Sequence, residues 1–286
     1  MKYIKYFIQF LLVLFSFVVF KIIGPKISSN LSGKLFEKIG PSFRPKKIIH
    51  SNLKKAFPSI TEDKLSSIMN LMWNNYGRTF AEYIFMKDFR FGRLKNNIEI
   101  EGQEIIDDIK NSNKQVVFIS GHLANFELMA MHLEKSGVKL SAIYRPLNNI
   151  FLNPIMETIR EKYICNYQIR KGIGGIKKLI SLKNKNYSTA LMIDQRVSEG
   201  ILSNFFNHKA LTTTIPAQLV KKFDIPVVPV YIERIENITF KIKIQRPITF
   251  SKEANIEEIT AELNSILEKM ILNNPNQWIW SHNRWK

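Results

Sequence analysis

The segment Gly121–Glu127 places a histidine and a carboxylate five residues apart, between a short apolar run and a helical pattern. On one continuous ideal helix, five residues turn through roughly 140°, so the two side chains would not meet. If His122 lies in the turn before the helix, its ring can fold back and donate a hydrogen bond to Glu127. A carboxylate behind an imidazole fixes its tautomer and stabilises the imidazolium. The pair predicts a general base, worth about 10²–10⁴ in rate; a purely structural histidine is the alternative.

The sequence lacks the usual signs of a protein nucleophile or a metal centre. Ser120 is not within a G-x-S-x-G motif, and no H-E-x-x-H motif occurs. Cys165 lies in an apolar setting, which favours a buried, inert thiol. Without such a nucleophile, we expect a substrate hydroxyl to attack directly after His122 removes its proton.

Several elements must position this pair. A long amphipathic helix is expected over 61–85, followed by alternating strands and helices. Strands are expected at 115–120, 139–144, 165–169, 189–194 and 227–232, with an edge strand at 240–245. Helices are expected at 125–135, 151–162, 174–183, 215–223 and 256–272. The alternation predicts an α/β fold, with helices on both faces of a mainly parallel sheet and the active site at the strand ends.

The amino terminus predicts a membrane anchor. An uncharged apolar run from Tyr6 to Phe20 lies between lysines and covers roughly 22 Å, short of the ~30 Å hydrocarbon core. Residues 1–24 could just span if the flanking lysines snorkel, and a half-inserted anchor is equally compatible. A cleaved signal peptide is a further alternative, although no small-x-small site follows the run. Basic residues downstream place the domain on the cytoplasmic side.

The composition limits the classes of partner and ligand that the protein is expected to bind. The 286 residues carry a formal charge of +18, which favours anionic lipid, an acidic carrier protein or nucleic acid. A single cysteine excludes an intrachain disulfide, and the scattered histidines do not suggest a structural zinc site. No recognition helix or RNP-like strand supports nucleic-acid binding. We expect neither a metal nor a cofactor.

The ordered motifs resemble the lipid A biosynthesis (late, or secondary) acyltransferases, of the lauroyl and myristoyl type. That family belongs to the glycerolipid acyltransferase superfamily with its H-x₄-D/E motif, here His122 and Glu127. The resemblance covers nearly the whole chain. Its further motifs are Asn52-Leu53 with Phe57-Pro58, Tyr144-Arg145-Pro146, Arg170-Lys171-Gly172, Asp194-Gln195, and the terminal Pro275-x-Gln277-Trp278-x-Trp280-x-His282-x-Arg284-Trp285.

The resemblance implies a glycerolipid-acyltransferase-like α/β domain over 25–286, with a helical lead-in at 25–100 behind the 1–24 anchor. It implies transfer of a fatty acyl group from acyl carrier protein to a hydroxyl of a lipid A precursor, giving an acyloxyacyl group. The His122/Glu127 dyad would be the general base. The enzyme would work at the cytoplasmic face of the inner membrane.

Basic residues at two strand ends are candidate substrate contacts. Arg145 is expected to contact a substrate phosphate or the oxyanion, with plain surface solvation as the alternative. The backbone amides after Gly121 are the other oxyanion candidates. Arg170 and Lys171 precede a helix start, which suits a lipid phosphate.

Three other polar residues have an expected role in the site. Asn125 is expected to hold the dyad turn and bind substrate, or merely to cap the helix. Asp194 either orients a cation or caps the next turn, and Gln195 is expected to bind substrate beside it. Arg196 and Asn283 depart from the family pattern, which puts the details of donor or acceptor binding in question.

Two other functions fit the same sequence. One is acylation of a different glycolipid or phospholipid. The other is a non-enzymatic, membrane-anchored binder of polyanions, for which the charge is the only support.

Overall fold

The computed structural model describes residues 1–286, except for the side chains of Ile173 and Ile176. A seven-stranded sheet with the order β1-β9-β8-β2-β5-β3-β4 forms its centre. The strand pairs are parallel except for β8 with β9. The strands are β1 (Ile98–Glu101), β2 (Val117–Ser120), β3 (Leu140–Tyr144), β4 (Tyr167–Arg170), β5 (Ser188–Met192), β8 (Val227–Glu236) and β9 (Thr239–Ile244).

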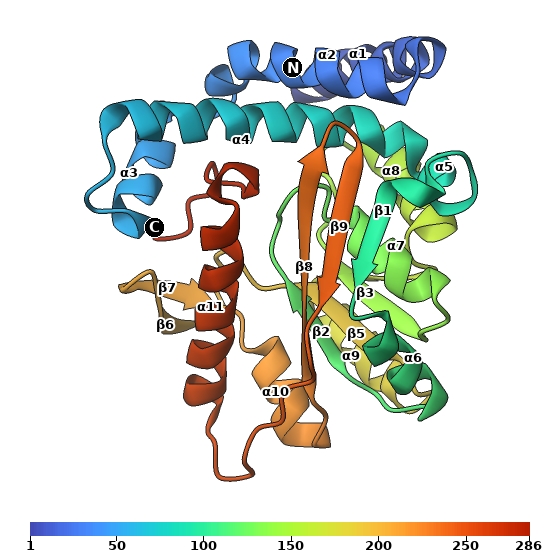
Figure 1. The fold of residues 1–286 in the computed structure, drawn as a ribbon, viewed down its shortest axis with the longest axis vertical. Helices are drawn as coiled ribbons and strands as arrows, with labels where there is room; N and C mark the ends of the chain where they lie inside the picture. The colour runs from blue at the N-terminus through green and yellow to red at the C-terminus, as the bar shows by residue number, and fades with distance from the viewer.

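Helices cover both sides of the sheet, with α10 and α11 on one side and α6 and α7 on the other (Figure 1). These helices are α6 (Gln103–Asn111), α7 (Glu127–Lys135), α8 (Leu152–Tyr163), α9 (Ile173–Lys183), α10 (Ile215–Phe223) and α11 (Ile256–Asn273). The predicted α/β class with a mainly parallel sheet is therefore confirmed. Because β8, β2, β5, β3 and β4 are parallel, their carboxyl ends share one edge of the sheet.

The sequence prediction was wrong about the sheet edge. The strand predicted as an edge, β9, pairs with β8 on one side and with β1 on the other. Its alternation arises because Phe240, Ile242 and Ile244 face the core while lysines face outwards, which describes one solvated face and not an edge position. The four-residue edge strand β1 and the hairpin of β6 (Ile201–Phe205) and β7 (His208–Thr212) were not predicted.

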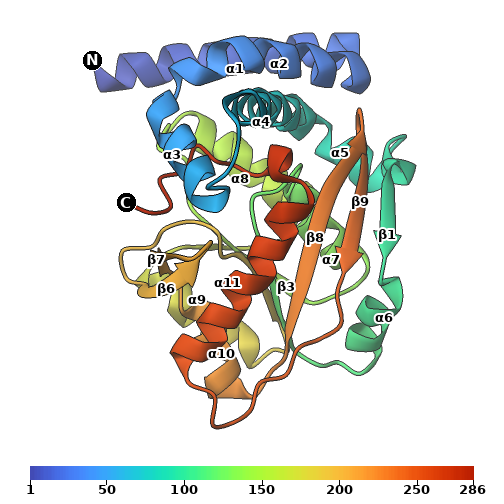
Figure 2. The same cartoon turned by 60° about the vertical axis from the view of Figure 1, so that its left-hand side comes forward.

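The amino-terminal helices form a separate layer. They are α1 (Lys2–Ile23), α2 (Pro25–Ile39), α3 (Lys46–Ala56), α4 (Glu62–Glu82) and α5 (Met86–Phe91), joined in part by 3₁₀ turns. Figure 2 shows α1 and α2 side by side above α4, with α2 returning along α1. The reversal occurs at Gly24, whose φ of +84° suits glycine.

Close packing joins α2 to α4. A Cβ atom at Gly77 would lie 2.4 Å from the carbonyl oxygen of Ser32, so only glycine permits this approach. Ser32 Oγ donates a 2.7 Å hydrogen bond to the Gly77 carbonyl. The long helix α4, predicted over 61–85, therefore connects the amino-terminal layer to the strand ends.

Candidate active site

His122 and Asp194 come together at the carboxyl ends of two neighbouring strands. Ser120 at the end of β2 is paired with Met192 at the end of β5, and each of the two side chains follows two residues later. His122 Nδ1 lies 2.8 Å from Asp194 Oδ1. Gly121 lies against the same carboxylate residue, since a Cβ there would be 3.4 Å from Asp194 Cβ.

Asp194 is a buried carboxylate with three donors. Besides the ring of His122, the backbone N–H of His122 donates to Oδ2 at 2.9 Å and the indole N–H of Trp278 donates to Oδ2 at 2.8 Å. Burial opposes ionisation of this carboxyl, but the His122 charge and these hydrogen bonds lower the pKa of Asp194 to about 2. Asp194 is therefore ionised at neutral pH.

His122 has the properties of a base that Asp194 orients. Burial lowers its pKa, but the charge and hydrogen bond of Asp194 outweigh burial, so the pKa of His122 is raised above its ordinary value. With the Nδ1 proton directed at an ionised carboxylate, Nε2 carries the lone pair. The ring is 21% exposed and packs edge-on against Phe126 at 4.7 Å between centroids. It lines a small cavity of about 40 Å³, together with Met72 and Tyr76 of α4.

The expected hydrogen bond between His122 and Glu127 does not form. Glu127 Oε1 instead accepts from Arg160 of α8, at 2.9 Å from Nε and 2.5 Å from Nη2. Glu127 is in the first turn of α7, where it faces α8, while the ring of His122 turns toward β5. Glu127 and Arg160 still lie close enough for their charges to act on His122, in opposite directions.

The turn between the base and α7 is held by backbone contacts. Ala124 has a left-handed φ of +45°, and its N–H donates to the carbonyl of Gln277 at 2.9 Å. Its carbonyl accepts from Thr79 Oγ1 at 3.0 Å and from Asn75 Nδ2 at 3.4 Å. A non-glycine residue in this conformation persists only where surrounding contacts fix it, and α4 and the 3₁₀ turn Pro275–Gln277 provide them.

Asn125 is enclosed by the protein. It is fully buried, and its Nδ2 donates to Glu82 Oε2 at 3.0 Å. Glu82 is itself buried and pairs with Arg234 of β8. Of the roles expected for Asn125, the geometry supports holding the turn, and its side chain does not cap α7. Its burial gives no support to the expected substrate contact, which stays a prediction.

Three of the backbone amides that follow Gly121 already have acceptors within the protein. His122 donates to Asp194, Leu123 to the Gly121 carbonyl and Ala124 to the Gln277 carbonyl. Arg145 is exposed after β3. A different cation, Arg160, is near enough for its charge to lower the pKa of His122, and its guanidinium is held by Glu127.

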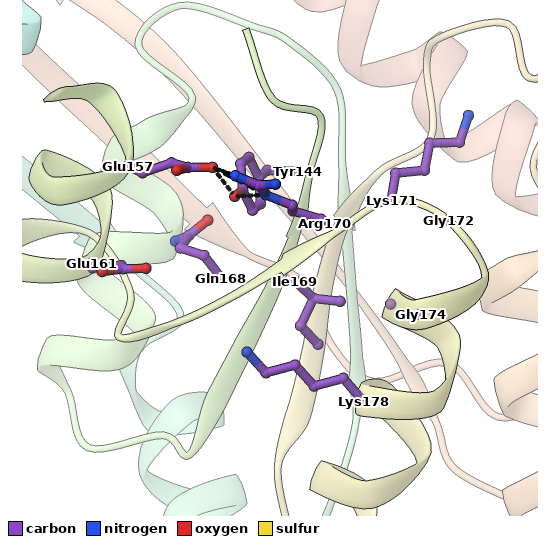
Figure 3. Close-up of a pocket in the computed structure, with 11 residues that line it drawn as sticks. Tyr144, Glu157, Glu161, Gln168, Ile169, Arg170, Lys171, Gly172, Gly174 and Lys178 are labelled. Carbon is purple, nitrogen blue, oxygen red and sulfur yellow. Dashed lines mark hydrogen bonds and ion pairs between the residues drawn. The ribbon is translucent and has the colours of Figure 1, made fainter. Parts of the chain in front are cut away.

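Arg170 and Lys171 line a second, larger pocket of about 490 Å³ at the ends of β3 and β4. Figure 3 shows Arg170 and Tyr144 converging on Glu157, while Lys171 points away from them. Arg170 Nη2 lies 2.9 Å from Glu157. Two strands, β5 and β3, separate β4 from β2, so these basic residues are not grouped with His122.

Sequence reasoning missed Arg160 and the contact from Trp278. A single arginine on an amphipathic helix carries no signal that it faces a site. Trp278 was in a recognised motif, but its partner Asp194 is 84 positions away in the chain. Gln195 was singled out; it follows Asp194 directly and is half-buried.

Together, the fold and the site define an α/β protein with a partly exposed, carboxylate-oriented histidine at the strand ends. The model of the family described as bacterial lipid A biosynthesis acyltransferases matches residues 1–286. The chain belongs to this family and is an acyltransferase of lipid A biosynthesis, which confirms the prediction from the motifs.

Curated relatives agree with this assignment. A lipid A biosynthesis myristoyltransferase of Escherichia coli K12 is 23% identical over 87% of this chain and 76% of its own length. A lipid A biosynthesis lauroyltransferase of the same organism is 24% identical over 85% of this chain and 79% of its own. The solved structure of the 1-acyl-sn-glycerophosphate (LPA) acyltransferase PlsC from Thermotoga maritima matches with a TM-score of 0.43 and 15% identity, over 88% of this chain and 99% of that one.

Proposed function

We propose that the protein transfers a fatty acyl chain from the thioester of acyl carrier protein to a hydroxyl of a lipid A precursor, forming an acyloxyacyl group. The observation that carries the mechanism is the 2.8 Å contact between His122 Nδ1 and the buried Asp194. This contact leaves Nε2 as the atom that takes a proton. Membership in an acyltransferase family removes the non-enzymatic alternative.

The reaction needs one base and no covalent enzyme intermediate. His122 Nε2 removes the proton of the acceptor hydroxyl as its oxygen attacks the thioester carbon. The tetrahedral intermediate then collapses and the C–S bond breaks. The leaving thiolate is protonated by His122, which returns to its neutral form. Asp194 stabilises the imidazolium between the two steps. Asp194 thus takes the orienting role that the sequence assigned to Glu127.

Arg160 is the cation that we assign to the oxyanion. It is held in place by Glu127 and is 14% exposed, so its charge acts in a largely desolvated setting. One preorganised oxyanion donor is typically worth about 2.7–4 kcal/mol. In this scheme Glu127 contributes by positioning Arg160.

The exposed cations suit anionic groups on the substrates. We assign the phosphates of the acceptor to Arg170 and Lys171 in the larger pocket. Arg145 and Gln195, at neighbouring strand ends, are the other proposed contacts. The net charge of +18 fits both a phosphorylated lipid and an acidic carrier protein. The chain would act at the cytoplasmic face of the inner membrane, where acyl carrier protein is found.

A transfer assay tests the proposal. The purified full chain would be given a panel of acyl carrier protein thioesters with a lipid A precursor, and the product analysed by mass spectrometry. We expect one added acyl chain with the native protein and a loss of most turnover for His122→Ala. Unchanged acyl number in the lipid A of a deletion strain would instead indicate a different glycolipid or phospholipid acceptor.

A further inference from the structure

We propose that Trp278 is a positioning residue for the base: its indole N–H holds the Asp194 carboxylate toward His122 and moderates how strongly that carboxylate attracts the imidazole proton. Trp278 belongs to the carboxyl-terminal tail, residues 275–286, which lies beyond α11. Its Nε1 lies 2.8 Å from Asp194 Oδ2. The inference rests on the acyl transfer proposed above and adds to it a residue from outside the strand ends.

The carboxylate of Asp194 uses its two oxygens for different partners. Oδ1 faces His122 Nδ1, whereas Oδ2 accepts from the indole of Trp278 and from the backbone N–H of His122. Two donors on one oxygen fix the rotation of the carboxylate and so direct the other oxygen at the imidazole. Hydrogen bonds to a charged acceptor are about twice as strong as neutral ones. Trp278 therefore contributes to the orientation of Asp194 as well as to the stability of its charge.

Burial makes the indole N–H hard to replace. Trp278 is 1% exposed and Asp194 is fully buried, so solvent does not offer a substitute donor. Removing one partner of a buried hydrogen bond leaves the other with the full cost of its desolvation. An indole nitrogen is a donor only, so the proton of this contact stays on Trp278. The indole thus supplies a fixed dipole that does not titrate.

The tail also holds the turn that carries the base. Trp278 pairs with Leu123 in an antiparallel bridge, and the Gln277 carbonyl accepts from the Ala124 N–H at 2.9 Å. In Figure 1 this part of the tail leaves α11 beneath α4. One short segment therefore contacts the chain after β2 through its backbone and the chain after β5 through an indole. Trp278 fixes the base and its orienting carboxylate relative to each other.

Contacts farther along the tail keep Trp278 in place. Asn52 of α3 donates to the carbonyls of Trp280 and His282, at 2.8 and 2.7 Å. Arg284 is fully buried and donates to the Leu211 carbonyl of β7 at 2.6 Å. The tail is thereby tied to α3 and to the β6–β7 hairpin. A group that acts on a charge is most effective when the surrounding structure fixes its position in advance.

The hydrogen bond from Trp278 also affects the proton equilibrium of the pair. Burial raises the pKa of Asp194, whereas the charge and hydrogen bonds of His122 and the hydrogen bond of Trp278 lower it to about 2. The indole dipole stabilises the carboxylate most when the imidazole is neutral, because an imidazolium already compensates the carboxylate charge. Trp278 therefore favours the neutral, proton-accepting form of His122. Without the indole N–H, we expect the pKa of His122 to be higher.

Other charged or titratable groups surround the pair on several elements. They are Glu127 of α7, Arg160 of α8, and His282 and Arg284 of the tail. Glu127 raises the pKa of His122 and Arg160 lowers it. His282 is neutral at neutral pH, because burial lowers its pKa to about 4. The indole N–H is directed at Asp194 and not at these groups, so its removal reports on that one contact.

The first experiment removes the indole N–H and follows acyl transfer against pH. Trp278→Phe keeps an aromatic ring in the tail but has no donor for Asp194. We expect kcat to fall about tenfold, since a hydrogen bond to a charged group is lost. The acidic limb of kcat/KM should move to higher pH. A tryptophan that served only for packing would lower the amount of folded chain and leave the limb in place, which would overturn the proposal.

The matched control is Trp280→Phe. Trp280 is fully buried, and its indole donates to the Pro275 carbonyl at 2.7 Å. The change removes a second buried indole N–H of the same tail without touching Asp194. Urea unfolding should show a lower stability, while the acidic limb stays at the native pH. If Trp280→Phe moved the limb as far as Trp278→Phe, the effect would come from the packing of the tail and the proposal would be wrong.

A direct titration separates this inference from the proposed function. In the full chain with ring-labelled histidine, the nuclear magnetic resonance signal that is missing from His122→Gln reports the pKa of His122. We expect a higher pKa in Trp278→Phe than in the native chain and in Trp280→Phe. An unchanged pKa would overturn the inference whether or not the chain transfers acyl groups. A higher pKa in a chain that transfers no acyl group would support the inference and contradict the proposed function.

A shape-matched analogue serves if Trp278→Phe does not fold. Benzothienylalanine at position 278 replaces the indole N–H by sulfur and keeps the two fused rings. The folded analogue should show the same rise in the pKa of His122. A native pKa in the folded analogue would overturn the proposal.

Discussion

Asp194 and His122 occupy equivalent positions after two adjacent parallel strands, each two residues beyond a pair of residues aligned in the register. The parallel sheet thus brings together two residues 72 positions apart, with Nδ1 and Oδ1 2.8 Å from each other. The carboxylate is fully buried and the imidazole is partly exposed, so only the histidine is open to a substrate. This division makes Asp194 the orienting group and His122 the base.

The substitution Asp194→Asn tests this division. Asparagine keeps the size of the side chain but cannot stabilise the imidazolium, so we expect kcat to fall by about 10²–10⁴-fold. Steady-state kinetics of acyl transfer measure the change, with circular dichroism to confirm folding. Glu127→Gln is the matched comparison; if it caused the larger loss and Asp194→Asn were nearly neutral, the pairing derived from the structure would be wrong for catalysis.

The pH profile gives a second prediction. His122 must be neutral to act as a base, and Asp194 raises its pKa above its ordinary value of about 6.5. The native kcat/KM should therefore fall as the pH drops through an apparent pKa above that value. In Asp194→Asn, the negative charge that raises the pKa of His122 is gone, while burial still lowers that pKa. The acidic limb should therefore move to lower pH. A profile that moved to higher pH would contradict this.

The strands that support the site could be predicted from the sequence more accurately than the side-chain contacts within the site. The apolar runs ending at Ser120 and near Asp194 were recognised, and the parallel class places both strand ends at one edge. The partner of His122 was nevertheless assigned by nearness in sequence to Glu127. The neighbour order of β2 and β5 decides that contact, and strand order is a tertiary property that no local pattern encodes.

The helical lead-in over 25–100 shows the same limit of prediction from local sequence patterns. The long helix α4 was predicted from its spacing, whereas α2 was expected only as part of the helical lead-in over 25–100 that the resemblance implied. Its small buried residues and apolar exposed face reverse the pattern used to recognise a core-facing helix. The short strand β1 has only four residues, too few for alternation to distinguish it from a loop.

Arg160 gives a third prediction. Its charge lowers the pKa of His122, and we assign it to the oxyanion. Arg160→Gln should therefore lower kcat by about 10²–10³-fold and move the acidic limb of the profile to higher pH. Arg160→Lys is the control, because it keeps the charge but loses the two-point contact with Glu127. If Arg160→Gln raised KM and left kcat unchanged, this residue would be assigned to ground-state binding.

The last prediction concerns the ion pair between Glu82 and Arg234, which fixes Asn125 and so the turn after His122. Glu82 is fully buried and also accepts from Ser29 of α2 at 2.7 Å. Removing one partner leaves an uncompensated buried charge, so Arg234→Ala should lower the free energy of unfolding by about 3–5 kcal/mol in urea.

The matched control for Arg234→Ala is Lys241→Ala, which removes the more exposed pair with Glu101 and should cost no more than about 1 kcal/mol. If Arg234→Ala and Lys241→Ala lowered the free energy of unfolding equally, the buried pair of Glu82 and Arg234 would not hold the turn through its charge. If it does, Glu82→Gln should also lower kcat for acyl transfer at temperatures where the variant stays folded, because Asn125 loses the carboxylate that positions the backbone beside the base.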